Sequence, residues 1–194
     1  GVPQDRKRVI IVGIRQDLDV TFEFPKPLKR KPSLRDAIGN LPDSVPAKDK
    51  NAPNENLDIS NHEHMIGSFS SMFMSRNRRR EWDEASFTIQ AGGRHAPLHP
   101  GSSEMVKVEK DKWEFEDGEE AVRRLSVREC ARVQTFPDEF EFLYSNVSKG
   151  YKMIGNAVPV NLAYAIAEQI RKVLAREIKF TVYEEVPITT FIEN

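Results

Sequence analysis

The sequence predicts an α/β protein in which a buried strand and a long helix accompany a small, irregular, β-containing region. Residues 8–14 form a nearly continuous apolar run rich in β-branched residues, the pattern of a strand buried on both faces of an α/β sheet. Residues 161–178 repeat apolar side chains at helical spacing after a proline, which predicts the longest helix. The chain between them has polar, Pro/Asn-rich stretches and only short apolar runs, which favours loops and short strands.

The predicted elements of the first half are a turn at 17–19, a short strand at 21–24, a Pro/Lys-rich connector at 25–32, a helix at 33–39 and a polar surface loop at 41–59. In the helix, Ser33 is the N-cap and Asp36 occupies the capping-box position. Gly39 is the expected stop.

The predicted elements of the second half are a strand at 86–90, a Gly-Gly loop at 91–94, strands at 105–108 and 113–115, helices at 126–133 and 161–178, and a tail at 179–194 without a recognised motif. Ser126 and Glu129 form a capping box at the start of the first of these helices, and Pro137 is expected to end it.

Composition limits the class of protein. The 194 residues can build one sizeable core or two small domains. No apolar run is long enough to span a membrane and no leader resembles a signal peptide, so the cytoplasm is the expected compartment. One cysteine and four histidines exclude a disulfide framework, and we expect no metal site.

Charge is informative locally and not in total. The formal net charge is −1, which does not indicate a nucleic-acid-binding protein. Arginines nevertheless gather in two groups, and local patches govern contacts to phosphates because salt screens distant charges. The first group is Arg76, Arg78, Arg79 and Arg80, and the second is Arg123, Arg124, Arg128 and Arg132.

Residues 4–8 carry two arginines two positions apart. In an extended segment, Arg6 and Arg8 share one face, so both could project into a cleft. The alternative is a solvated strand end.

Arginine suits base recognition because its fork matches the O6 and N7 atoms of guanine in the major groove. The arginines at 74–80 and beside the Gly-Gly loop at 91–95 are presented from an irregular scaffold, which fits base readout. The alternative is an ordinary charged surface.

Two features near the end of the chain need separate interpretations. Cys130 lies in a predicted helix among core positions, so a small packed side chain is a better interpretation than a nucleophile. Residues 155–160 place a Gly-Asn turn before a helix, and a helix N-terminus offers backbone donors to a polar ligand. The alternative is a plain loop-to-helix turn.

Together these blocks resemble the DNA cytosine-5 methyltransferases. Residues 124–137 and 151–160 resemble the last two conserved blocks of that family, and residues 4–8 resemble its Gln-x-Arg-x-Arg block. Residues 61–64, 73–78, 87–94 and 98–100 resemble the target-recognition region of bacterial restriction–modification methyltransferases that modify GGCC. The resemblance covers residues 1–175 and about the final third of the family pattern.

The resemblance implies part of a Rossmann-like, S-adenosylmethionine-dependent methyltransferase domain and a small irregular target-recognition domain. The implied segments are a catalytic-domain strand at 1–25, a recognition domain at 26–144 with a hinge block at 124–137, a return to the catalytic domain at 145–178, and a tail at 179–194. Arg8, with Arg6, would position the target cytosine. Many relatives carry Ser at the position of Ala157, which weakens its side-chain role. The other implied roles are guanine contacts by Arg76, Arg78 and Arg94, and S-adenosylmethionine contacts by Asn156 and Ala157.

The implied reaction is methyl transfer to C5 of cytosine in a short duplex site, for restriction–modification in a bacterial cytoplasm. The chain has no Pro-Cys dipeptide, no Glu-Asn-Val and no glycine-rich strand–turn–helix segment. We therefore expect a C-terminal fragment or subunit that is inactive alone. Its expected partners are double-stranded DNA, the N-terminal catalytic portion, and other copies of itself through exposed apolar surface. The alternatives are a non-catalytic, sequence-specific DNA-binding module and a non-functional remnant.

Overall fold

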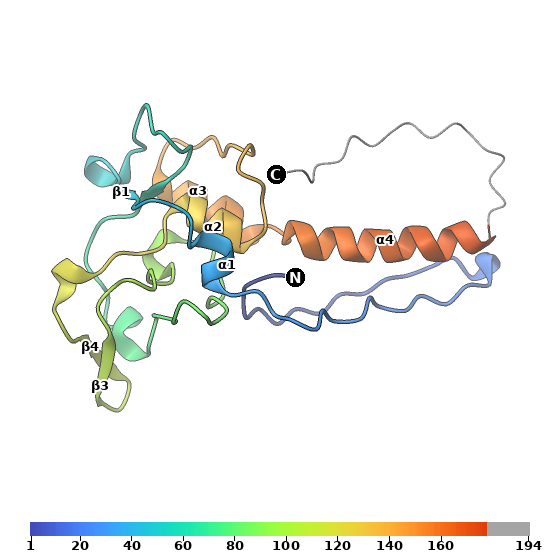
Figure 1. The fold of residues 1–194 in the computed structure, drawn as a ribbon, viewed down its shortest axis with the longest axis horizontal. Helices are drawn as coiled ribbons and strands as arrows, with labels where there is room; N and C mark the ends of the chain where they lie inside the picture. The colour runs from blue at the N-terminus through green and yellow to red at the C-terminus, as the bar shows by residue number, and fades with distance from the viewer. Residues whose placement is uncertain (178–194) are drawn as a thin grey trace. The chain divides into compact units, whose positions relative to one another are not determined.

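The computed structural model describes residues 1–177, coloured in Figure 1. They divide into a larger unit, Gly1–Arg8 with Pro27–Ala163, and a smaller unit, Val9–Lys26 with residues 164–177. The tail expected at 179–194, and the last residue of the helix expected at 161–178, lie outside the described residues.

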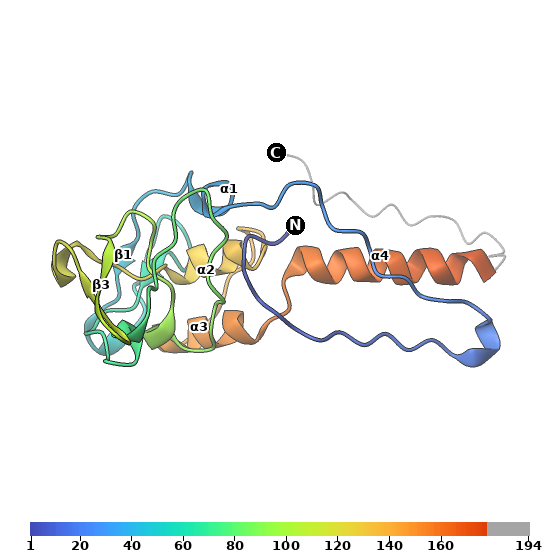
Figure 2. The ribbon, with the colours of Figure 1, turned by 90° about the horizontal axis from the view of Figure 1, so that it is seen from below.

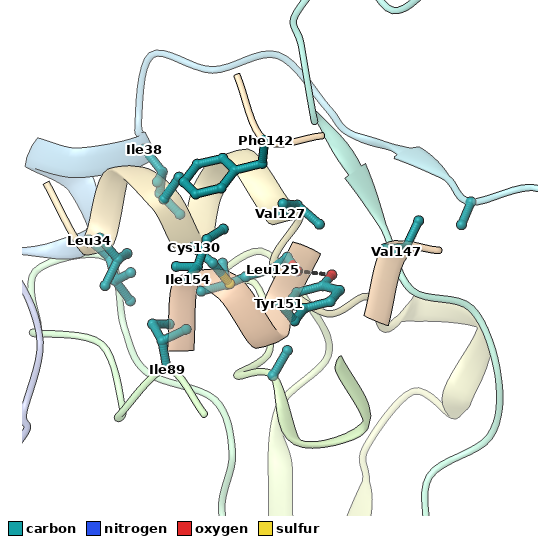
Figure 3. Close-up of a cluster of buried hydrophobic side chains, with 14 residues drawn as sticks. Leu34, Ile38, Ile89, Leu125, Val127, Cys130, Phe142, Val147, Tyr151 and Ile154 are labelled. Atoms are coloured by element: carbon teal, nitrogen blue, oxygen red, sulfur yellow. Dashed lines mark hydrogen bonds between the residues drawn. The ribbon is translucent and has the colours of Figure 1, made fainter. Parts of the chain in front are cut away.

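Three short helices enclose the main core of the larger unit. They are α1 (Leu34–Ile38), α2 (Val127–Val133) and α3 (Val147–Asn156). Figure 3 shows their apolar side chains converging, with Cys130 and Tyr151 in the centre. Tyr151 donates its hydroxyl hydrogen bond to the Leu125 carbonyl at 2.6 Å. Burial raises the pKa of the Cys130 thiol, and its side chain is packed as predicted.

Both predicted capping boxes are present. The Ser33 side chain accepts from the Asp36 amide and the Asp36 carboxylate accepts from the Ser33 amide, so α1 starts where predicted. Ser126 and Glu129 do the same for α2. However, α2 ends at Val133, before Pro137, because Thr135 adopts a left-handed backbone with φ 61°.

Two small sheets complete the larger unit. The strands β1 (Val45–Pro46) and β2 (Glu63–His64) pair in parallel within and beside the predicted loop. The strands β3 (Met105–Glu109) and β4 (Lys112–Phe115) form the predicted antiparallel pair. Figures 1 and 2 place this hairpin at the far end of the larger unit from α1. The 3₁₀ helices within residues 1–177 are η1 (Gln16–Leu18), η2 (Asp49–Asn51), η3 (Phe73–Ser75), η4 (Gly93–His95) and η5 (Glu119–Ala121).

The strands predicted at 8–14 and 21–24 are wrong for this structure. Both segments lack regular structure, and Val9 and Ile11 are each 89% exposed. A strand needs a neighbouring backbone to pair with, and none of the β pairings recorded for residues 1–177 involves these segments.

The strand predicted at 86–90 is reduced to one bridge, between Gln4 and Ser86. The Gln4 side chain takes the place of a continued ladder, since its Oε1 accepts from the Ile89 amide at 2.8 Å.

The C-terminal helices correct one prediction and confirm another. Gly155 and Asn156 lie in the last turn of α3 instead of in a loop, and α3 itself was not predicted. The long helix is present as α4 (Val160–Glu177). Over residues 1–177, no helix has the length and apolar character that crossing a bilayer requires.

Candidate nucleic-acid interface

A cleft of about 180 Å³ opens on the larger unit. It brings Arg76 and Arg78 together beside Asp5, from the block at 4–8. Its lining consists of Asp5, Arg76, Asn77, Arg78, Phe87, Thr88, Gln90, His95 and Pro97. Two of the three arginines predicted to contact guanine therefore face one cavity.

Hydrogen bonds fix the start of the chain along one side of this cleft. The Asp5 amide donates to the Ser86 carbonyl at 2.8 Å, and the Thr88 hydroxyl donates to the Asp5 carbonyl at 2.6 Å. Gln4 also donates from Nε2 to Gln134 Oε1 at 3.1 Å. The glutamine of the Gln-x-Arg-x-Arg block is therefore a structural link to the end of α2.

Arg6 and Arg8 have different surroundings. Arg6 donates to the Ile89 and Gly155 carbonyls, both at 2.9 Å, and so joins the segment at 86–90 to the end of α3. Burial lowers the pKa of the Arg6 guanidinium, and the charge of Arg8 lowers it further. Arg8 is exposed and donates only locally, to the Lys7 carbonyl at 2.6 Å. Neither arginine lines the cleft, and their role toward a target cytosine stays a prediction.

The guanidinium of Arg78 is bound by carbonyls of the protein itself. It is 7% exposed, and it donates from Nε to the Phe73 carbonyl at 3.0 Å and from Nη2 to the Met72 carbonyl at 3.1 Å. Burial lowers the pKa of this guanidinium. Because these bonds hold η3 in place, Arg78 could read a base through its fork only by exchanging them.

The next two arginines of the run also bind oxygens of the protein. Arg79 donates to the Pro100 carbonyl at 3.0 Å and pairs with Glu81. Arg80 pairs with Asp5 and Glu84, each at 3.0 Å, and lies over the ring of Phe87.

Arg76 and Arg94 are different, because both are exposed. In the part of the chain that the structure describes, neither guanidinium has a hydrogen-bond or ion-pair partner. Arg94 follows Gly93, where a Cβ would lie 2.5 Å from Met65 Sδ and 2.8 Å from Tyr151 Cδ2. The glycine lets η4 pack against the core and leaves Arg94 at the surface.

The predicted cofactor residues lie at the end of α3. Asn156 is exposed, so its side-chain amide can bond a ligand. The backbone amide of Ala157, in contrast, already donates to the Ile154 carbonyl at 3.1 Å. The first donors of α4 are also used, because Val160 and Asn161 donate to Gln134 O and Thr135 Oγ1 at 3.1 and 2.9 Å. The groups left to contact S-adenosylmethionine would be the side-chain amide of Asn156 and the methyl group and carbonyl of Ala157. Groups of three or more His, Cys, Asp or Glu able to hold a metal are absent from the described residues.

The hinge block contains a buried arginine that sequence reasoning did not single out. Arg128 is 0% exposed and donates to four oxygens: Ser60 O, Asn61 Oδ1, Pro137 O and Phe140 O. Burial lowers the pKa of this guanidinium. A helical arginine on the same face as Arg132 looks like a surface residue in sequence, and only the loops that fold over α2 reveal its role.

The other two arginines of the block, and Arg123 just before it, are also structural. Arg124 donates to the Gly67 and Ser68 carbonyls and lies 4.1 Å from the centre of the Phe69 ring. Arg123 makes two bonds of 2.9 Å to the buried carboxylate of Glu129. Arg132 pairs with Asp138 at 2.6 Å.

Comparisons with known proteins identify the family. A family model described as C-5 cytosine-specific DNA methylase matches residues 1–172. Type II methyltransferase M.MthTI of Methanothermobacter thermautotrophicus is 63% identical over 174 residues, which is 89% of this chain and 53% of that protein. Type II methyltransferase M.FnuDI of Fusobacterium nucleatum is 51% identical over 180 residues, with 90% and 52% covered.

A solved Escherichia coli structure, described as a DNA modification methyltransferase encoded within a prophage, aligns with a TM-score of 0.58 at 19% identity. It covers 90% of this chain and 57% of that one. The alignment supports the fold, and with the family match it confirms the predicted α/β methyltransferase class. The chain spans about half the length of the curated relatives described above.

Proposed function

Because the chain belongs to the C-5 cytosine-specific DNA methylase family, we propose that it is the C-terminal portion of a restriction–modification enzyme. That enzyme methylates C5 of cytosine in a short duplex site, and the site is GGCC. The observation that carries the proposal is the cleft that sets the free guanidinium of Arg76 beside the Gln-x-Arg-x-Arg segment. The blocks at 61–64, 73–78, 87–94 and 98–100 support GGCC as the sequence.

In this proposal the chain supplies binding and positioning. Arg76 and Arg94 contact guanines, because their forks are free and match O6 and N7. Arg8 contacts the target cytosine after it leaves the duplex. Arg6 is a positioning residue, since its bonds to Ile89 and Gly155 fix the segment that carries Arg8.

Methylation also needs a thiolate that adds to C6 of the cytosine and a methyl donor. S-adenosylmethionine supplies the methyl group when it is bound, and Asn156 with Ala157 would form one edge of its site. Cys130 cannot serve as the nucleophile, because it is fully buried in the core. The sequence holds no other cysteine, so the proposal assigns the nucleophile to a separate N-terminal portion in a bacterial cytoplasm.

The proposed division of the chain assigns 1–25 and 145–178 to the catalytic domain and 26–144 to target recognition, with 124–137 as the hinge and 179–194 as a tail. Exposed apolar side chains on each of the two units support separate surfaces that the N-terminal portion, or a second copy, would cover. Those most exposed are Val9, Ile11, Leu143, Tyr164 and Met72.

A second candidate is a DNA-binding module without catalysis. The core beneath Arg76 and Arg94 lies within the larger unit, so sequence reading by this chain needs no catalytic step.

Two measurements on the purified chain test these candidates. The first follows transfer of a labelled methyl group from S-adenosylmethionine to a GGCC duplex, and we expect none. The second compares binding of GGCC and scrambled duplexes across a salt series. A preference that persists as salt rises supports base reading, because phosphate contacts weaken with salt for every sequence. Methyl transfer by the chain alone would contradict the division into portions, and equal, salt-sensitive binding would contradict the assigned site.

A further inference from the structure

Three side chains on the cleft have unused hydrogen-bonding capacity. Within residues 1–177, the side chains of Arg76, Gln90 and His95 have no hydrogen-bond or ion-pair partner. Their neighbours on the cleft are engaged. Asp5 accepts from Arg80, Asn77 Oδ1 accepts from the Arg79 amide, and the Thr88 hydroxyl donates to Asp5 O. A ligand in the cleft would therefore meet a guanidinium, a carboxamide and an imidazole.

The backbone that carries Gln90 is held on both sides. The preceding Ile89 is 0% exposed, its amide donates to Gln4, and its carbonyl accepts from Arg6. On the other side, a Cβ on Gly155 would lie 2.4 Å from the Gln90 carbonyl carbon and oxygen. The helix backbone thus packs directly on Gln90, and its side chain starts from a fixed position beside Arg76, as a specificity contact requires.

The chemistry of a G·C pair matches these groups. Its major-groove edge presents the acceptors N7 and O6 on guanine and the N4 amino donor on cytosine. The guanidinium of Arg76 supplies donors for guanine. The carboxamide of Gln90 supplies an acceptor, Oε1, which the arginines of the cleft cannot offer.

We propose that Gln90 is a further specificity-determining residue, which accepts a hydrogen bond from the N4 amino group of the cytosine paired with the guanine that Arg76 contacts. This inference rests on the proposed function, because it assumes that the cleft faces duplex DNA. Glutamine also recognises adenine through two bonds. Cytosine is favoured here because the adjacent arginine selects guanine, whose paired base carries the N4 amino group.

The test measures binding of the full chain to a GGCC duplex and to duplexes with one base pair replaced at each position, by fluorescence anisotropy. Gln90→Ala should reduce discrimination at one cytosine position by about tenfold and leave the other positions unchanged. Gln90→Glu keeps an acceptor and should keep the cytosine preference, although its charge weakens binding to every duplex. Gln16→Ala, at an exposed glutamine outside the cleft, is the matched control, and thermal unfolding shows that each variant is folded.

The outcomes separate the two levels of the proposal. If the wild-type chain prefers GGCC and Arg76→Ala abolishes the preference, while Gln90→Ala changes no position, the role of Gln90 is overturned and the proposed function stands. Loss of the cytosine preference in Gln90→Glu as well as Gln90→Ala would also overturn the acceptor role. If the wild-type chain prefers no sequence at any salt concentration, the assigned reading site fails and this inference fails with it.

Discussion

Two arginine groups look alike in sequence and differ in what their guanidinium groups contact. In the hinge block and the residue before it, the guanidinium groups of Arg123, Arg124, Arg128 and Arg132 all bind protein oxygens, and Arg128 is completely buried. In the run from Arg76 to Arg80, the first arginine is free on the cleft and the others are bound to the protein. A charge cluster can therefore stabilise a fold, read a ligand, or divide those tasks among its members, and the acceptors around each guanidinium decide which.

The largest expected effect is on stability, from Arg128→Ala. Removing the guanidinium leaves the carbonyls of Ser60 and Phe140 without their donor inside the protein and takes one of two donors from Asn61 Oδ1 and Pro137 O. The free energy of unfolding should fall by about 3 kcal/mol or more, because a buried charged network is broken. Urea unfolding measures this loss. Arg76→Ala is the matched control and should change stability by less than about 0.5 kcal/mol. Similar losses of stability in Arg128→Ala and Arg76→Ala would contradict the distinction between a structural arginine and one free to bind a ligand.

The second effect is on sequence preference, from Arg76→Ala. The loss of a two-bond guanine contact should reduce discrimination between GGCC and scrambled duplexes by about 1–3 kcal/mol. Fluorescence anisotropy at two salt concentrations provides the measurement. Arg15→Ala removes another exposed arginine, from a surface ion pair, and it should leave the preference intact. If the two variants bind alike, Arg76 contributes only general charge.

Local sequence predicted the elements that local chemistry determines. The capping boxes at Ser33 and Ser126 placed two helices correctly, because each box satisfies donors within one turn. Local sequence did not predict α3, because this helix contains Gly150 and Gly155 and so has low helix propensity. Both glycines are required by distant contacts. A Cβ would lie 2.7 Å from the Tyr144 ring at the first and 2.4 Å from Gln90 at the second.

The same limit applies to the strand and the site. The apolar pattern at 8–14 predicts a strand, but pairing depends on a partner that the pattern does not contain. Arg76 and Arg78 sit two residues apart with similar neighbours in sequence. Only the fold separates them, by placing the Met72 and Phe73 carbonyls against Arg78.

The third effect is a pH dependence of stability that comes from His64 and His99. Burial lowers the pKa of His64 and of His99 to about 4, although the nearby Glu129 carboxylate opposes the shift. The unfolded chain, with a histidine pKa of about 6.5, then binds protons before the folded chain does as pH falls. The contribution of the two neutral histidines to the free energy of unfolding is therefore complete above about pH 6.5, and it decreases progressively toward about pH 4.

Urea midpoints at neutral pH and at a pH inside this window measure the pH effect. Carboxylates also destabilise folded proteins in acid, so the comparison is with His64→Gln/His99→Gln, whose midpoint should depend less on pH. An equal pH dependence in the wild type and the double variant would show that these histidines are not the cause.

The smallest expected effect tests whether members of one run divide their tasks. Arg80 is partly exposed and holds Asp5 and Glu84, so Arg80→Ala should cost less than about 1 kcal/mol of stability. It leaves the Asp5 carboxylate unpaired on the cleft, where it repels the phosphates of any duplex. Binding of GGCC and scrambled duplexes should therefore weaken by the same factor in Arg80→Ala, whereas Arg76→Ala weakens mainly GGCC. A sequence-selective loss in Arg80→Ala would mean that the two arginines act as one reading unit.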